Sequence, residues 1–149
     1  LDDLMDACKA PREVREGSYK LGVRLLKIFS RYESSPIMSE IEQAMLSGRA
    51  RGYYPLVFAL VACVSGIAKY EALYALYYNT AVGVVTNGVK LIPLGQMMGQ
   101  DILYGLREPI EQAVARSMTP DIEWLGSCMV ASDIRAMQHE RLYTRLYMS

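Results

Sequence analysis

Only one histidine is available for acid–base or metal chemistry in this chain of 149 residues. It opens the stretch HERLY, in which Tyr143 stands where an H-E-x-x-H zinc protease has its second ligand. A nucleophile–base pair would have to use the same His139. The cysteines, Cys8, Cys63 and Cys128, are far apart, and such a set rarely makes a closed metal site. We therefore expect no catalytic residues, no metal site and no cofactor.

Two glycines between residues 91 and 103, LIPLGQMMGQDIL, could cradle a phosphate, permit a close helix crossing or mark only a turn. A P-loop has a lysine followed by Ser or Thr after its second glycine. Here Gln100 and Asp101 occupy those positions, and Asp101 would repel a phosphate. The phosphate interpretation is therefore excluded.

The same segment suits the packing of helices. Gly95 and Gly99 lie four residues apart, hence on one helical face, where another backbone can come close. Beside them, Gln96 and Gln100 form a polar row that could bond to a neighbouring backbone or to a partner. G-x-x-x-G alone is a weak signal, so we assign only helix packing to Pro93 and these four residues.

The elements that position these residues are predicted to be helices. Apolar residues recur at three- and four-residue steps, and no strand alternation or repeat interrupts them. Helices are expected over residues 11–32, 36–47 (ending at Gly48), 54–64, 69–89, 94–117 and from Ser132 or Asp133 to His139, with a capped short segment at 119–125. The fold class is all-α, a single-domain bundle of about six to eight helices over residues 1–149.

Two details of these helices can be checked. Pro109 should kink the helix over 94–117, because proline removes a backbone donor and clashes with the preceding turn. The buried stripe of that helix should be Met98, Ile102, Leu106, Ile110 and Val114.

Two runs without charge, 52–68 and 72–89, raise the question of a membrane. A spanning helix needs about 20 predominantly apolar residues. The first run is shorter and contains Pro55, and the second is interrupted by Asn79, Thr80 and Asn87. We favour buried helices of a soluble bundle. The alternative is a fragment of a helical integral membrane protein.

Charge and cysteine use bear on the compartment. Sixteen basic residues balance sixteen acidic ones, so the whole chain has no electrostatic reason to bind nucleic acid or an anionic membrane. Three cysteines without a C-x-x-C pair indicate a reducing compartment. The first ten residues lack the features of a secretory signal. A cytoplasmic protein is expected.

Three surface patterns each have two interpretations. The basic row of Lys20, Arg24, Lys27 and Arg31 is interpreted as a solvated face rather than a partner surface. The aromatic stripe of Tyr70, Tyr74, Tyr77 and Tyr78 is interpreted as core rather than interface. The acidic cluster of Asp2, Asp3 and Asp6 is interpreted as a solvated helix face rather than an acid–base set.

The C-terminal residues 133–149 are interpreted as a docking tail. Arg141 and Arg145 lie four apart among Leu142, Leu146 and Tyr147, so a helical tail would present an apolar and a basic edge. Pairing with a partner carboxylate is the interpretation we favour.

Three segments resemble one family, the UreF urease accessory proteins. They are PREVREGSYKLGVRLL (11–26), VKLIPLGQMMGQDIL (89–103) and SDIRAMQHERLYTRLYMS (132–149), in the order and spacing of the family. The last matches the carboxyl terminus of the family, with its D-I-x-x-M-x-H-E run followed by R-L-Y-x-S. The chain differs in lacking the first helices of the family, so it looks like the larger C-terminal part.

The resemblance implies an all-helical, non-enzymatic, cytoplasmic protein that dimerises. Such proteins join UreD (UreH in some organisms) and the GTPase UreG to deliver nickel to apo-urease, and their C-terminal segment becomes ordered against UreD. The partner-binding residues it implies here are Met137, His139, Glu140, Arg141, Arg145, Leu146 and Tyr147. With one histidine and no clustered thiols, the isolated chain should not hold nickel tightly, although a symmetric homodimer could bring two copies of His139 together. A sharper interpretation of the tail follows from the resemblance, in which one of its arginines is a finger for the GTPase.

Overall fold

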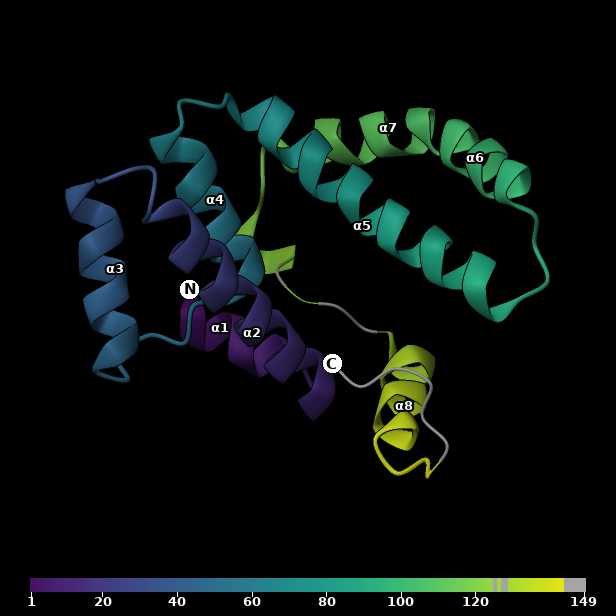
Figure 1. The fold of residues 1–149 in the computed structure, drawn as a ribbon, viewed down its shortest axis with the longest axis horizontal. Coiled ribbons are helices and arrows are strands. Elements are labelled where there is room, and N and C mark those ends of the chain that lie inside the picture. Colours follow the sequence, from purple (N-terminus) through teal and green to yellow (C-terminus); the bar gives the residue numbers. More distant parts are fainter. Residues whose placement is uncertain (125, 127–128, 144–149) are drawn as a thin grey trace. The chain divides into compact units, whose positions relative to one another are not determined.

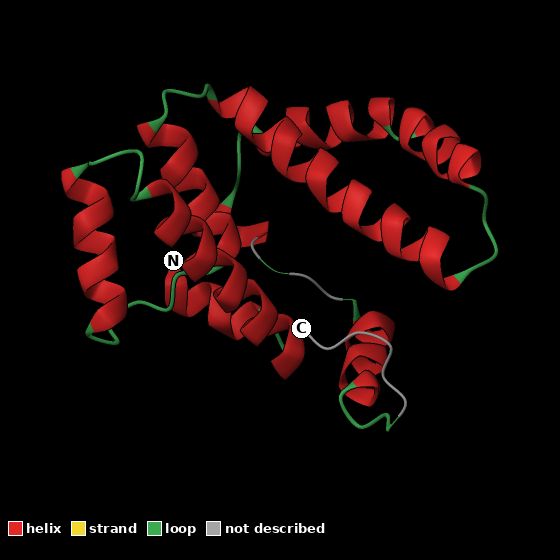
Figure 2. Ribbon diagram, viewed as in Figure 1, coloured by secondary structure: helices red, strands yellow, loops and turns green. Residues whose placement is uncertain are grey.

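The computed structural model describes residues 1–124, 126 and 129–143. Within these residues the chain forms helices and no strand, which confirms the all-α prediction (Figures 1 and 2). One compact unit contains residues 1–64 and the described part of 125–149, and the other contains residues 65–124. The first unit holds α1 (Asp2–Cys8), α2 (Arg12–Phe29), α3 (Pro36–Leu46), α4 (Tyr54–Val64) and α8 (Val130–His139). The second holds α5 (Lys69–Leu91), α6 (Gln96–Gly105), α7 (Arg107–Ser117) and the 3-10 helix η1 (Ile122–Trp124).

Most predicted boundaries are confirmed. α4 has the bounds that its apolar run indicated. α3 begins at Pro36, because the fixed φ of proline suits the first turn of a helix. Gly48 stands just beyond the end of α3 with φ of +73°, a conformation that glycine adopts without strain. In the short segment, the carboxylate of Asp121 accepts a hydrogen bond from the backbone N–H of Glu123 at 3.0 Å.

The first unit is organised by α2 and α4, which pack against each other (Figure 1). A Cβ atom at Gly22 of α2 would lie 2.0 Å from the carbonyl oxygen of Gly52 and 3.0 Å from the backbone nitrogen of Tyr54. The missing side chain therefore lets the backbone before α4 lie directly on α2. One turn further along α2, a core cluster joins α2, α3 and α4 through Leu26, Met38, Val57 and Val61.

In the second unit, α6 and α7 pack against α5. Two hydrogen bonds tie α5 to the end of α7: the Tyr77 hydroxyl lies 2.7 Å from Ser117 Oγ, and Lys69 Nζ donates to the Met118 carbonyl at 2.7 Å. The buried residues of this unit come from α6 and α7, and they include Leu103, Ile110 and Val114.

The prediction of one kinked helix over 94–117 is wrong. α6 ends at Gly105 and α7 begins at Arg107. Pro109 explains the break, because it has no N–H to donate to the Gly105 carbonyl and its ring clashes with that group. The break also changes the buried stripe: Ile110 and Val114 are buried as predicted, whereas Met98 and Ile102 are exposed.

Two other expectations are corrected. α8 begins at Val130, so Ser132 and Asp133 lie inside the helix rather than at its cap, although its end at His139 is as predicted. α5 is not a buried helix, since none of its residues is buried and Tyr70 and Tyr78 are about two-fifths exposed. No helix in the described part of the chain has the length and apolar content to cross a membrane.

We predict that Gly22→Ala destabilises the protein by about 3 kcal/mol, because its methyl group would overlap the Gly52 carbonyl. Gly83→Ala is the matched change inside α5, where nothing lies within 4 Å of the new Cβ atom. It should raise the free energy of unfolding by about 0.5–1 kcal/mol through helix propensity. Chemical denaturation of the three proteins measures both effects. Equal stability of Gly22→Ala and the parent would show that α2 does not approach the loop so closely.

Candidate partner-binding site

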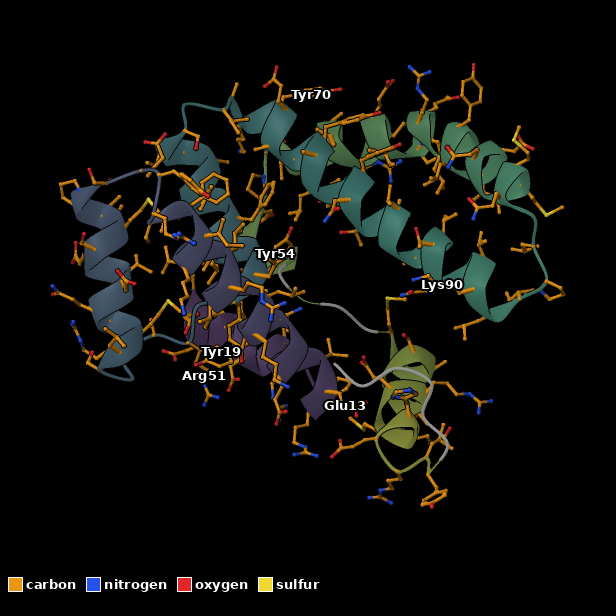
Figure 3. The ribbon with its side chains drawn as sticks, in the orientation of Figure 1. Glu13, Tyr19, Arg51, Tyr54, Tyr70 and Lys90 are labelled. Carbon is orange, nitrogen blue, oxygen red and sulfur yellow. The ribbon has the colours of Figure 1, made fainter. Side chains whose placement is uncertain are left out.

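The candidate site begins where the C-terminal helix meets the start of α2. His139 Nδ1 lies 2.8 Å from Glu13 Oε2, and Arg12 Nε donates to Glu140 Oε1 at 2.8 Å. Arg12 also approaches Glu140 through its Nη2 atom. We call these two adjacent pairs the α2–α8 clasp. Glu13, labelled in Figure 3, projects from the end of α2 that carries these contacts.

Helix ends place the four side chains of the clasp. Pro11 is the N-cap of α2, so Arg12 and Glu13 stand in its first turn. His139 is the last residue of α8, and Glu140 is its C-cap. A carboxylate is favoured near a helix N-terminus and a protonated imidazole near a C-terminus. Glu13 therefore suits the helix end on which it stands.

The side of α8 away from His139 is apolar and exposed. Val130, Ile134 and Met137 recur at steps of four and three, so they share one helical face. Their exposed fractions are 59%, 49% and 43%. The helical repeat places His139 roughly opposite this face. α8 therefore contacts α2 along one edge and offers an apolar surface along the other.

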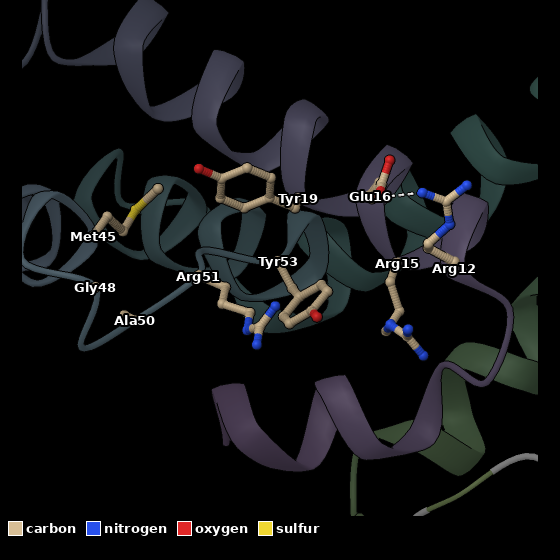
Figure 4. Close-up of a pocket in the computed structure, with 9 residues that line it drawn as sticks. All are labelled: Arg12, Arg15, Glu16, Tyr19, Met45, Gly48, Ala50, Arg51 and Tyr53. Carbon is tan, nitrogen blue, oxygen red and sulfur yellow. Dashed lines mark ion pairs between the residues drawn. The ribbon is translucent and has the colours of Figure 1, made fainter. Parts of the chain in front are cut away.

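A pocket of about 490 Å³ lies beside the clasp, between α2 and the loop before α4 (Figure 4). It is lined by Arg12, Arg15, Glu16, Tyr19, Met45, Gly48, Ala50, Arg51 and Tyr53. Arg12 Nη1 lies 3.5 Å from Glu16 Oε1, the pair drawn as a dashed line. Since the pocket arginines already have carboxylate partners, the pocket lacks the uncompensated positive charge of a strong anion site.

Asp6 of α1 is the centre of the polar contacts at this pocket. Its Oδ1 accepts a hydrogen bond from the Tyr53 hydroxyl and lies 3.9 Å from Arg15 Nε and 3.8 Å from Arg51 Nη1. Asp2 accepts from the backbone N–H groups of Arg51 and Gly52. The interpretation of the acidic cluster as a solvated face is therefore wrong for Asp2 and Asp6. Both residues hold the loop that enters α4.

Burial raises the pKa of Tyr53 to about 12, and the hydrogen bond to the Asp6 carboxylate adds to this shift. The side chain of Tyr53 is 1% exposed. Ionisation would place a phenolate next to a carboxylate inside the unit, so burial and the neighbouring negative charge both oppose it.

Of the remaining predicted residues, the structure describes Met137 and Arg141. Met137 lies on the apolar face of α8, and Arg141 is exposed just beyond that helix. Arg145, Leu146 and Tyr147 lie outside the described residues.

The residues assigned to helix packing belong to the second unit. Pro93 lies between α5 and α6, and Gly95 is the N-cap of α6 with no atom within 4 Å of a Cβ placed there. A Cβ atom on Gly99 would lie 2.9 Å from Val89 Cγ2, so the close approach is made at Gly99 alone. Gln96 and Gln100 line a pocket of about 110 Å³ with residues of α5.

No three metal-ligating side chains gather among the described residues. Sequence reasoning missed the contacts of Asp2, Asp6 and Tyr53 and the partners of His139. Apart from the Asp6–Arg15 pair, each of these contacts joins residues that are more than 40 positions apart. A helical pattern is local and carries no signal for such contacts.

The raised pKa of Tyr53 generates a prediction about alkaline stability. The folded protein keeps the Tyr53 proton up to about pH 12, whereas the unfolded chain releases it near pH 10. The stabilisation is complete below pH 10 and is lost as the pH rises toward 12. We expect Tyr53→Phe to cost about 1–2 kcal/mol at neutral pH and to lose less stability than the parent between pH 10 and 12.

Denaturation curves at several pH values measure this difference. Tyr32→Phe, which removes an exposed hydroxyl, is the matched control and should follow the parent. Parallel losses in the parent and in Tyr53→Phe would contradict the assignment.

The sequence of this chain is similar to those of known proteins. The family model for UreF matches residues 1–107. The chain is 64% identical to the urease accessory protein UreF of Actinobacillus pleuropneumoniae serotype 5b (strain L20), covering all of this chain and 66% of that protein. It is 61% identical to the UreF of Haemophilus influenzae (strain ATCC 51907 / DSM 11121 / KW20 / Rd), covering all of this chain and 63% of that protein.

A more distant relative matches over the same extent. The UreF of Arthrobacter sp. (strain FB24) is 37% identical, with all of this chain and 66% of that protein aligned. The chain thus spans somewhat less than two thirds of the length of these relatives. The α2–α8 clasp lies within the aligned length, since each alignment covers the whole chain. The chain belongs to the UreF family of urease accessory proteins.

Proposed function

We propose that this chain is an adaptor that assembles with UreD (UreH), the GTPase UreG and apo-urease, and that the assembly supports nickel insertion. Membership of the urease accessory family supports the proposed role in nickel insertion. The observation that carries the adaptor role is α8, which is fastened to α2 along one edge and exposes Val130, Ile134 and Met137 along the other. An amphipathic helix of this kind binds an apolar groove of a partner.

The docking segment in this proposal continues beyond α8. Arg141 follows the clasp directly, and Arg145, Leu146 and Tyr147 extend the same alternation of basic and apolar residues. UreD is the partner that binds this segment, and UreG joins through UreD. The arginines pair with partner carboxylates, since such pairs orient a complex and speed its formation.

The adaptor has no catalytic activity of its own in this proposal and works in the cytoplasm, as a homodimer. Nickel is cargo. The one histidine already contacts Glu13 through Nδ1, which leaves few donors for a tight nickel site on a single chain. Any nickel contact made by this chain would combine His139 with donors from a second copy or from a partner.

Removal of Arg141 to Ser149 tests the proposal. The truncated chain keeps both pairs of the α2–α8 clasp, so its helicity by circular dichroism should match that of the parent. We expect it to lose copurification with UreD and, through UreD, with UreG. Copurification of the truncated chain with UreD at parental yield would contradict the docking role.

Arg145→Ala separates docking from a direct action on the GTPase. If the variant keeps the complex but slows GTP hydrolysis by UreG several-hundred-fold, the arginine-finger interpretation replaces the docking one. Leu46→Ser controls for the general effect of a surface substitution, because Leu46 is an exposed apolar residue at the C-terminal end of α3.

A further inference from the structure

The outer face of α2 carries two parallel rows of exposed side chains. The apolar row is Val14, Leu21 and Ile28, which are 44%, 55% and 47% exposed. The basic row is Lys20, Arg24, Lys27 and Arg31, all of them exposed. We call the two rows together the outer seam of α2.

The spacing of the apolar row is that of a helix–helix interface. Its members recur every seven residues, so the row runs almost parallel to the helix axis. From Val14 to Ile28 it extends about 21 Å, at 1.5 Å per residue. The buried side of α2, marked by Gly22 and Leu26, faces α4 and the core cluster. The outer seam is therefore a second, separate contact face on the same helix.

Beyond Glu16, the charges beside the apolar row are of one sign. Residues 17–32 contain four cations and no carboxylate, although the whole chain is neutral. Arg12, Arg15 and Arg51 each lie within 4 Å of a carboxylate. Among the described residues, Arg24, Lys27 and Arg31 have no such partner. No carboxylate in the described part of the chain therefore compensates Arg24, Lys27 or Arg31.

We propose that the outer seam of α2 docks an acidic amphipathic helix of a partner protein. The leucine-sized apolar residues of that helix pack along Val14, Leu21 and Ile28, and its carboxylates face Arg24 and Lys27. Apolar contact supplies the affinity, and opposite charge supplies orientation and rate of association. The inference does not depend on UreD, UreG or the C-terminal tail.

The geometry favours a protein helix over a membrane or nucleic acid. A membrane-bound helix has a wide apolar face with polar residues on both sides. Here the apolar row is one residue wide and has cations on one side only, because the other side turns toward the core. A surface for nucleic acid would need the cations, but it would have no use for the exposed aliphatic row beside them.

The probe for this surface is a synthetic helical peptide of about three heptads with leucine at the a and d positions and glutamate at e and g. A matched peptide has lysine in place of every glutamate. Fluorescence anisotropy with the whole chain should show binding of the glutamate peptide, weakening with salt, and binding of the lysine peptide at least about tenfold weaker.

Variants assign the binding to the outer seam. Leu21→Ser combined with Ile28→Ser should weaken binding about tenfold or more, and Arg24→Gln combined with Lys27→Gln should weaken it about fivefold and reduce its salt dependence. Leu46→Ser and Arg49→Gln are the matched controls on other exposed positions of the unit and should change binding less than about twofold. Thermal melts confirm that each variant remains folded.

Several results would overturn the proposal. They are equal binding of the two peptides, binding that survives the Leu21 and Ile28 changes, and tighter binding of phosphatidylserine vesicles or duplex DNA than of the glutamate peptide. Loss of UreD binding by the tail truncation with retained peptide binding would separate this surface from the proposed function.

Discussion

The first unit depends on a contact that contains no side chain. At Gly22 the backbone of α2 lies against the loop carrying Gly52 and the start of α4, and even a methyl group would overlap a carbonyl oxygen. This approach brings Tyr53 into the interior, where its hydroxyl reaches Asp6. It also sets Val57 and Val61 of α4 against Leu26 of α2. The core cluster, the loop and the pocket all follow from how close the two helices come.

The sequence predicts local structure well where the signal is local. The bounds of α4 follow from an apolar run, and those of α3 follow from a proline at one end and a glycine at the other. The sequence predicts that Pro109 disturbs the helix, but it does not predict that the helix breaks into α6 and α7. Whether a proline bends a helix or ends it depends on whether the turns on either side can keep their hydrogen bonds. Gly22 gave no signal, since a pattern of apolar residues cannot register a side chain that is absent.

The contacts of the candidate site could not be predicted from the sequence, because they join residues that are far apart along the chain. His139 and Glu13 are 126 positions apart, and neither residue type favours one long-range partner over another. The acidic residues of α1 show the same limit, because three aspartates near a helix start resemble a solvated face until the loop that they bind is known. The resemblance to UreF identified the family where the individual residues did not.

The attachment of α8 has a consequence for the motions of the chain. This helix has no buried residue, and its contacts with α2 include the two polar pairs of the clasp, which are partly exposed to water. Partly exposed ion pairs contribute little, so detaching α8 costs far less than unfolding the unit around Gly22. Its amide hydrogens should exchange with solvent long before those of α2 and α4. A helix that detaches on its own in this way can dock on another protein while the rest of the unit stays folded. Because detaching it costs little free energy, a partner that binds the detached helix loses little affinity.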